Sequence, residues 1–338
     1  MKGGALSTSG SKDLELLIDG RRSKVRRLTL GESRARLWSI VKRAPEVIVK
    51  VTGGGKTTKH VLKHMTYITR HGELEAHTDQ GDVVLGKEGV RELLDSWDLD
   101  ISKGQGKLRQ AFNIVLSMPA GTPPQKVLAA AQKFAREKFW GEHQYMMVLH
   151  EPDTDPHRDA KPHPHVHLLV KAENYQGQRL YIRKATLEAW RQDFAQYLRE
   201  QGVEAMATPR EVRGVTMKPK KTGPYRAEKR SESTVLKKKL GEISQEIKGQ
   251  GGGERPWEDA IAAKRVQIVR AVLGAAKEME TAGDPQLAAA LGQYAKDLPP
   301  LETERHVLTR ELLARIEKGR DKVASQEQQR APEADKDR

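Results

Sequence analysis

The sequence contains no cysteine, and only 5% of its 338 residues are aromatic. Without cysteine there is no disulfide, no thiolate zinc site and no thiol nucleophile, which leaves histidine and carboxylate side chains as plausible metal ligands. A reducing cytosol fits this composition. No apolar run approaches the roughly 20 residues of a membrane span, and the first residues, MKGGALSTSGSKDLELL, lack the apolar core of a signal peptide. We therefore expect a cytoplasmic protein without membrane insertion.

The chain has more Lys and Arg residues than Asp and Glu residues. The formal net charge is +14, while hydrophobic residues make up 37% of the chain and charged residues 31%. This balance favours a folded core with a polar extension. A surplus of Lys and Arg favours a polyanionic partner, because each neutralised phosphate releases a counterion. Nucleic acid is the leading candidate, although ribosome-associated and anionic-membrane proteins are equally basic.

Strand-like and helical segments alternate in the first two thirds of the chain. Aliphatic and β-branched runs predict strands at 46–51, 112–119, 145–152 and 165–172, and helical signals occur at 56–72, 86–97, 120–140 and 181–202. Thr122 is the expected N-cap of the third helix, with Pro123 at its first position. Some connections between strands are too short for helical crossovers. The predicted fold class is α+β: a central, mainly antiparallel sheet flanked by helices, followed by a helical C-terminal region.

Composition also predicts the domain organisation. We expect, in chain order, a basic N-terminal extension (1–45), a catalytic domain (46–215), a basic linker and helix (216–255), a helical region (256–325) and a disordered tail (326–338). Residues 216–338 carry no motif that we connect to chemistry.

The segment PHPHVHLLV, residues 162–170, carries the first candidate site. Side chains alternate between the two faces of a strand, so His165 and His167 share one face. His150 becomes a third ligand if the strand 145–152 pairs antiparallel with 165–172. A histidine-rich surface loop is the alternative interpretation. Neutral imidazoles suit zinc, manganese, nickel or iron, and with phosphate oxygens and waters such a site also takes magnesium.

The loop between these two strands, DTDPHRDAKPHP, supplies further candidates. If it folds back over the histidines, it brings Asp153, Asp155 and His163 near them. Carboxylates in this position orient ligating imidazoles.

A tyrosine in the first predicted helix is the second candidate. His60, His64 and Tyr67 share one face at positions i, i+4 and i+7, beside an apolar stripe. A structural tyrosine at the rim of a core is the alternative. The preceding GGGKT is not a nucleotide-triphosphate loop, because the pattern requires glycine where Lys50 stands. Its free amides and Lys56 can still hold a phosphate at the helix N-terminus.

Three segments, taken in order, resemble the motifs of the HUH endonucleases, and most closely those of P-type conjugative relaxases related to the T-DNA border-nicking endonuclease. VIVKVTGGGKTTKHVLKHMTYITRHGELE is similar to the family's tyrosine segment, with Tyr67 at the nucleophile position. FNIVLSMPAGT is similar to the second motif, in which Ser117 matches a serine that helps to place DNA. YMMVLHEPDTD and HPHVHLLV are similar to the third, whose metal ligands match His150, His165 and His167. The resemblance covers about residues 46–215.

The resemblance implies a mechanism. Tyr67 would attack one phosphodiester of single-stranded DNA at a plasmid or mobile-element transfer origin, forming a 5′-phosphotyrosyl enzyme that can religate. A divalent cofactor, Mg²⁺ or Mn²⁺ or another transition metal, would assist. The loop after Asp155 is longer than the family's compact HxDxDxxHxH pattern, so the proton acceptor stays open among three loop residues: Asp153, Asp155 and His163. The expected DNA-binding residues are Ser117, Lys56, Arg70 and Lys63.

The resemblance also implies partners. These are accessory origin-binding proteins, a coupling ATPase and a type IV secretion system, in a bacterial cytoplasm from which the protein is translocated while bound to DNA. A rolling-circle replication initiator uses the same chemistry and is the closest alternative. A non-catalytic DNA-binding mobilisation protein is another. A small-molecule metal hydrolase leaves the charge and the Tyr67 segment unexplained.

Overall fold

The computed structural model describes residues 16–17, 29–99, 108–157, 161–217, 219–220, 222–250, 253 and 255–330. The chain divides into two compact units, Met1–Pro209 and Arg210–Arg338. The finer domain limits expected from composition stay predictions, and residues 331–338 of the expected tail lie outside the described part. Among the described residues, no helix has the length and apolar character that crossing a membrane requires.

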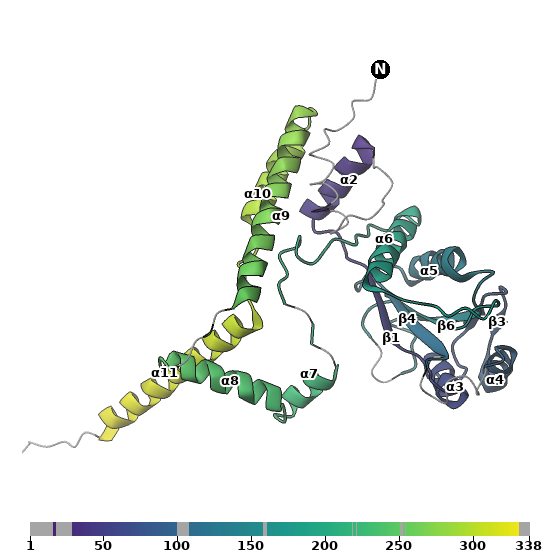
Figure 1. The fold of residues 1–338 in the computed structure, drawn as a ribbon, viewed down its shortest axis with the longest axis horizontal. Coiled ribbons are helices and arrows are strands. Elements are labelled where there is room, and N and C mark those ends of the chain that lie inside the picture. Colours follow the sequence, from purple (N-terminus) through teal and green to yellow (C-terminus); the bar gives the residue numbers. More distant parts are fainter. Residues whose placement is uncertain are drawn as a thin grey trace, which may run out of the picture. The chain divides into compact units, whose positions relative to one another are not determined.

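The first unit is built on a six-stranded sheet with the order β1-β4-β6-β5-β2-β3 (Figure 1). Its strands are β1 (Ile48–Gly53), β2 (Ala76–Thr78), β3 (Val83–Val84), β4 (Ala111–Ser117), β5 (Tyr145–His150) and β6 (His165–Lys171). Each of the five neighbouring pairs is antiparallel. The α+β class with a mainly antiparallel sheet is therefore confirmed. The short hairpin of β2 and β3 was not predicted, because two or three residues are too few to show a periodicity.

One face of the sheet carries α5 (Pro124–Phe139) and α6 (Lys184–Glu200) (Figure 1). Alternate strand residues such as Ile114 and Leu168 pack against Phe134 and Phe194, all fully buried. The predicted start of α5 is wrong by one residue: Pro123 is the N-cap, and Thr122 donates a hydrogen bond from its hydroxyl to the carbonyl of Pro119. This burial anchors the strands whose other face holds the histidines.

The opposite face carries α3 (Thr58–Ile68) and α4 (Gly86–Ser96) (Figure 1). The hydroxyl of the N-cap Thr57 accepts a hydrogen bond from the backbone N–H of His60. The buried stripe Val61, Met65 and Ile68 packs against α4 and the sheet. The helix ends four residues before the predicted stop at Gly72, because Arg70 and His71 adopt positive φ angles of 50° and 63°. This places Tyr67 in its last turn.

The remaining helices precede or follow the strands of the sheet in the sequence. Within the first unit, α2 (Leu30–Val41) begins with a capping box between Thr29 and Glu32. The second unit contains α7 (Thr222–Lys229), α8 (Thr234–Ile247), α9 (Pro256–Thr281), α10 (Pro285–Lys296) and α11 (Glu304–Arg330). Buried aliphatics of α9 and α10, among them Val272 and Leu291, form the core of a helical hairpin. The expected helical C-terminal region is thus confirmed.

Candidate metal centre and active site

Sheet register brings three histidines together. His150, the last residue of β5, lies opposite His165 of β6, and His167 lies two residues further along β6 on the same face. The ring centroids are 4.9 Å apart for His150 and His165, 4.7 Å for His150 and His167, and 5.2 Å for His165 and His167. One nitrogen from each ring lies within 4.8 Å of the others, close enough to hold one metal ion.

Hydrogen bonds to the far side of each ring orient the histidines. Nδ1 of His165 lies 3.1 Å from the carbonyl oxygen of His163. Nδ1 of His167 lies 3.1 Å from the side-chain nitrogen and 3.3 Å from the side-chain oxygen of Asn113. The Asn113 amide donates in turn to the hydroxyl of Thr52 at 2.7 Å. Protons on both Nδ1 atoms satisfy these contacts and leave Nε2 as the metal-binding atom, the arrangement seen at metal-binding histidines.

His150 is held through both ring nitrogens. Nε2 lies 2.6 Å from the carbonyl of Ile68 in α3, a contact that requires the proton on Nε2. Nδ1 then accepts a hydrogen bond from Arg70 at 3.0 Å. Sequence reasoning gave no sign of either contact, because both join segments about 80 residues apart.

All three imidazoles are neutral at physiological pH. Burial lowers the pKa of His150 to about 4, with a further contribution from the nearby Arg70 charge, and burial lowers the pKa of His167 to about 2. The pKa of His165 is lowered for the same main reason. Neutral imidazole is the form that binds metals. Both nitrogens of His150 are engaged in hydrogen bonds, so His150 must exchange one of these contacts for the ion in order to bind it. With that exchange the donor set fits a divalent ion, and three nitrogens leave coordination positions for oxygen ligands.

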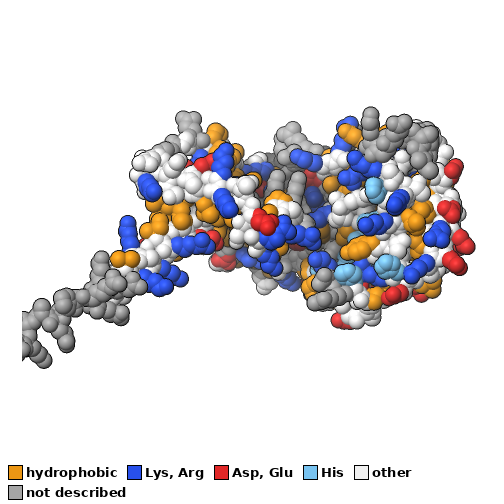
Figure 2. Space-filling view, turned by 90° about the horizontal axis from the view of Figure 1, so that it is seen from below, with side chains coloured by type: hydrophobic (Ala, Val, Ile, Leu, Met, Phe, Trp, Pro, Cys, Tyr) orange, Lys and Arg blue, Asp and Glu red, His pale blue; other side chains and the backbone are white. Residues whose placement is uncertain are grey.

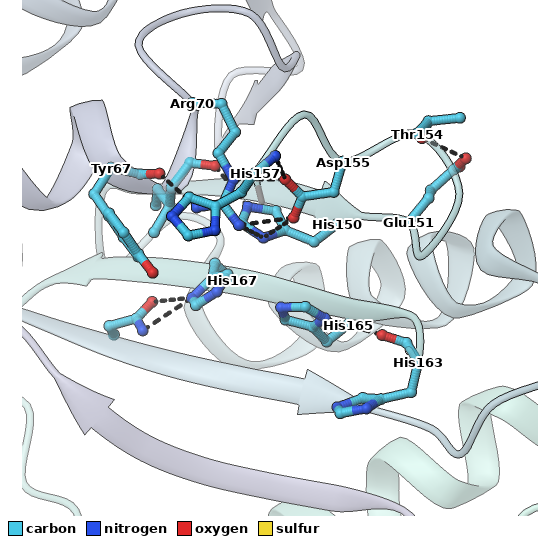
Figure 3. Close-up of polar contacts among 12 residues, drawn as sticks. Tyr67, Arg70, His150, Glu151, Thr154, Asp155, His157, His163, His165 and His167 are labelled. Atoms are coloured by element: carbon cyan, nitrogen blue, oxygen red, sulfur yellow. Dashed lines mark hydrogen bonds and ion pairs between the residues drawn. The ribbon is translucent and has the colours of Figure 1, made fainter. Parts of the chain in front are cut away.

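Tyr67 faces the same space from the end of α3. Its side chain is 52% exposed, so it does not pack in the core. Figure 3 shows the phenol pointing toward the side of the cluster where His167 lies. The ring of His157, from the loop between β5 and β6, is 6.1 Å from that of Tyr67, in an edge-on arrangement. His64, one turn earlier on α3, lies 6.5 Å from the ring of His167.

Asp155 and Arg70 form an ion pair beside the histidines (Figure 3). Nε and Nη2 of Arg70 donate to the two carboxylate oxygens of Asp155, each at 2.7 Å, and one of these oxygens is 3.2 Å from Nδ1 of His150. Burial alone would raise the pKa of Asp155, but hydrogen bonds from Arg70 and from the backbone N–H of His157 outweigh it and lower the pKa to about 2. The carboxylate is therefore charged at physiological pH.

The other predicted loop residues lie further from the cluster. Asp153 is exposed, and the structure shows no contact between its carboxylate and the histidines. His163 is half-buried, with its ring 5.5 Å from that of His165. Burial lowers its pKa, aided by the charges of Lys161 and Lys50. Within the described part of the loop, Asp155 is thus the only predicted carboxylate in contact with the cluster.

The predicted DNA-binding residues are scattered. Ser117 is 2% exposed and lies opposite His165, next to the metal centre. Lys63 is exposed on α3, whereas Lys56 precedes this helix, about 16 Å of helix length away from Tyr67. Arg70 is only 8% exposed and belongs to the centre itself. Of these four predicted residues, only Lys56 and Lys63 are exposed cations.

A row of exposed residues on β1 extends the site across the sheet. Lys50 lies opposite Val115, which lies opposite His167, and Ile48 lies opposite Ser117 in the next row. Ile48 and Lys50 are exposed on the face that carries the histidines. Figure 2 shows Lys and Arg side chains interspersed with histidines on one face of the molecule. The alternation in EVIVKV places Lys50 on that face and was the signal that sequence reasoning missed.

Comparisons with known proteins agree with this site. Residues 67–203 match the family model for relaxases described as MobA/VirD2-like, nuclease domain. The chain is also similar to the T-DNA border endonuclease VirD2 of Agrobacterium fabrum, with 28% identity over 215 residues, 58% of this chain and 46% of that protein. For VirD2 of Rhizobium rhizogenes the identity is 28% over 197 residues, 52% and 43% of the two chains. The chain thus spans less than half the length of these relatives.

The family match begins at Tyr67 and includes all three histidines of the cluster. Over the matched residues the chain is similar to relaxase nuclease domains of the MobA/VirD2 type. The resemblance expected from the sequence is thus confirmed for residues 67–203.

Proposed function

We propose that this protein nicks and religates one DNA strand at a transfer origin through a phosphotyrosyl intermediate on Tyr67, and so initiates conjugative transfer of a plasmid or mobile element. The observation that carries the proposal is the exposed phenol of Tyr67 beside three neutral imidazoles that share one face of the sheet. The relaxase family match and the net charge of +14 support DNA as the substrate.

The reaction is a transesterification. The phenolic oxygen of Tyr67 bonds to phosphorus, and the bond from phosphorus to the 3′ oxygen breaks, leaving a 5′-phosphotyrosyl enzyme and a free 3′-hydroxyl. Bond energy is conserved, so the reverse reaction religates the strand. A divalent ion held by His150, His165 and His167 would supply charge stabilisation at the non-bridging phosphate oxygens. Magnesium and manganese are the expected ions.

The phenolic proton needs an acceptor. Asp155 is a poor base, because its pKa is about 2 and both of its oxygens accept hydrogen bonds from Arg70. His157 has its ring edge-on to Tyr67, and His163 lies beside the cluster. We assign the acceptor role to one of these two histidines, and we assign Asp155 to holding Arg70 and His150.

The DNA strand is proposed to cross the exposed face of β1 and β4. Lys50 is placed to contact a phosphate next to the scissile one, because it lies in the same register row as His167. Lys63 would contact the strand from α3. Accessory origin-binding proteins, a coupling ATPase, a type IV secretion system and a bacterial cytoplasmic location stay predictions.

The test uses a labelled single-stranded origin oligonucleotide incubated with the protein and Mn²⁺ or Mg²⁺. We expect an adduct that survives boiling in detergent and maps to the Tyr67 peptide. Tyr67→Phe should form no adduct yet bind the oligonucleotide as tightly as wild type. Tyr181→Phe, at a tyrosine that is 72% exposed, is the matched control and should react normally. An adduct on Tyr67→Phe would refute the assignment.

A further inference from the structure

Arg70 has nearly all of its hydrogen-bonding capacity occupied within the protein. A guanidinium carries five N–H donors. Two of them bind Asp155, one binds Nδ1 of His150, and one on Nη1 binds the carbonyl oxygen of Tyr67 at 3.1 Å. One N–H is left, on a residue that is only 8% exposed. A phosphate would therefore have to displace existing contacts in order to bind Arg70.

The guanidinium also lies against the nucleophile. Its central carbon is 5.1 Å from the centroid of the Tyr67 ring, in a cation–π arrangement. The same side chain thus holds the backbone carbonyl of Tyr67 and stacks on its phenol. Through Asp155 and His150 it connects the end of α3 to the loop after β5 and to the metal centre.

The backbone at this point is strained, and the side chain stabilises it. Arg70 and His71 both have positive φ, at 50° and 63°. A left-handed conformation is unfavourable for a residue with a side chain. Such strain persists when surrounding contacts over-determine the geometry, and the bonds from Arg70 to Asp155, His150 and Tyr67 are contacts of that kind.

We propose that Arg70 is a positioning residue, not a DNA contact: its guanidinium holds Tyr67 in register with the three-histidine centre. This inference rests on the proposed function, because it assumes that Tyr67 is the nucleophile. For this role the planar geometry of the guanidinium matters more than its charge. Only arginine can donate to both oxygens of Asp155 while it also reaches His150 and the Tyr67 carbonyl. Lysine at this position would keep the charge and lose the geometry.

The experiment compares Arg70→Lys with wild type in single-turnover cleavage of the origin oligonucleotide at saturating Mn²⁺. Oligonucleotide affinity is measured separately by fluorescence anisotropy in a Tyr67→Phe background, and Mn²⁺ affinity by calorimetry. We expect cleavage to slow by about 100-fold, the effect of a displacement near 1 Å at a reacting group. Oligonucleotide affinity should stay within about twofold of wild type. Mn²⁺ affinity should fall by no more than about 10- to 100-fold, the effect of a residue that supports a ligand, and saturating Mn²⁺ compensates for this loss in the cleavage assay. Arg91→Lys, at an exposed arginine of α4, is the matched control and should leave all three values unchanged.

Asp155→Asn provides an independent variant if Arg70→Lys fails to fold. It weakens the partner of the guanidinium, so it should slow cleavage to a similar degree without weakening DNA binding. Two results would overturn the inference: a folded Arg70→Lys or Asp155→Asn protein that cuts at the wild-type rate, or oligonucleotide affinity that falls in proportion to the rate. Absence of any adduct in wild-type protein would instead refute the proposed function, so the two failures are distinguishable.

Discussion

The Arg70–Asp155 pair of the first compact unit is more buried than the ion pairs that the structure describes in the second. In the first unit, the carboxylate of Asp155 is 1% exposed, and its partner Arg70 is 85 residues away in the chain. In the second unit, Arg230 and Glu232 are two residues apart, with side chains 63% and 60% exposed. An exposed pair contributes little to stability, whereas breaking a buried pair is costly. Burial of an ion pair, and not its sequence separation, therefore distinguishes the unit that carries the three-histidine cluster.

A core substitution should have the largest effect on stability, and this effect should be confined to the unit that contains the substituted residue. Phe134 packs edge-on against Phe139, Trp190 and Phe194. We expect Phe134→Ala to lower the free energy of unfolding of the first unit by about 3–5 kcal/mol because it leaves a cavity. Hydrogen exchange read peptide by peptide measures this effect. Protection in α9 and α10 should not change, and a parallel loss there would show that the units do not fold independently.

Removing one imidazole should be the largest change at the metal centre. His167→Ala deletes one of three nitrogen ligands, so the affinity for Mn²⁺ should fall by more than about 100-fold, beyond the 10- to 100-fold effect of residues that only support ligands. Calorimetric titration measures it. His60→Ala, at an exposed histidine of α3, is the control and should bind as wild type does. Equal affinity in the two variants would argue against the centre.

A smaller loss is expected from the residue that orients His167. Asn113→Ala removes the side-chain oxygen that faces Nδ1 of His167. The ring is then free to rotate, and Mn²⁺ affinity should fall by about 10- to 100-fold. The same titration checks this result. If Asn113→Ala binds Mn²⁺ as tightly as wild type, Asn113 does not orient the ligand.

Acid should weaken the Arg70–Asp155 pair. The pKa of Asp155 is about 2 in the folded protein, below its ordinary value of 3.8. Its contribution to stability is therefore complete above pH 4 and is lost as the pH falls toward 2. Between pH 7 and pH 3, this pKa difference lowers the free energy of unfolding by about 1 kcal/mol. Urea unfolding at pH 7 and pH 3 should show the difference between wild type and Asp155→Asn narrowing by that amount. A constant difference would contradict it.

The smallest effect is expected from an ion pair of the helical unit. Arg305 of α11 pairs with Glu246 of α8, and the two side chains are 18% and 26% exposed. Arg305→Ala should destabilise the contact between these helices only slightly, because the pair is screened by solvent. Hydrogen exchange in α8 measures this effect. Cleavage and Mn²⁺ binding should stay at wild-type values. A change in the cleavage rate or in the Mn²⁺ affinity would show that the helical unit contributes to the reaction.

Local patterns account for what sequence reasoning predicted correctly. The antiparallel sheet follows from short connections, and the shared face of His165 and His167 follows from strand alternation. The end of α3 was misplaced, because Arg70 and His71 adopt left-handed backbone conformations that no local signal required. Asn113 was overlooked because an isolated polar residue in an apolar strand has no partner that a sequence can show.

The sequence by itself determined the chemical inventory: neutral nitrogen ligands in the absence of thiols, a tyrosine on the polar edge of a helix, and a strong positive charge. Strand and helix periods are local properties, so the faces on which these groups lie were also readable. Only the tertiary structure decided that Arg70 is buried against Asp155 and His150 instead of facing solvent. That choice depends on contacts between segments more than 80 residues apart, where sequence spacing carries no information about distance.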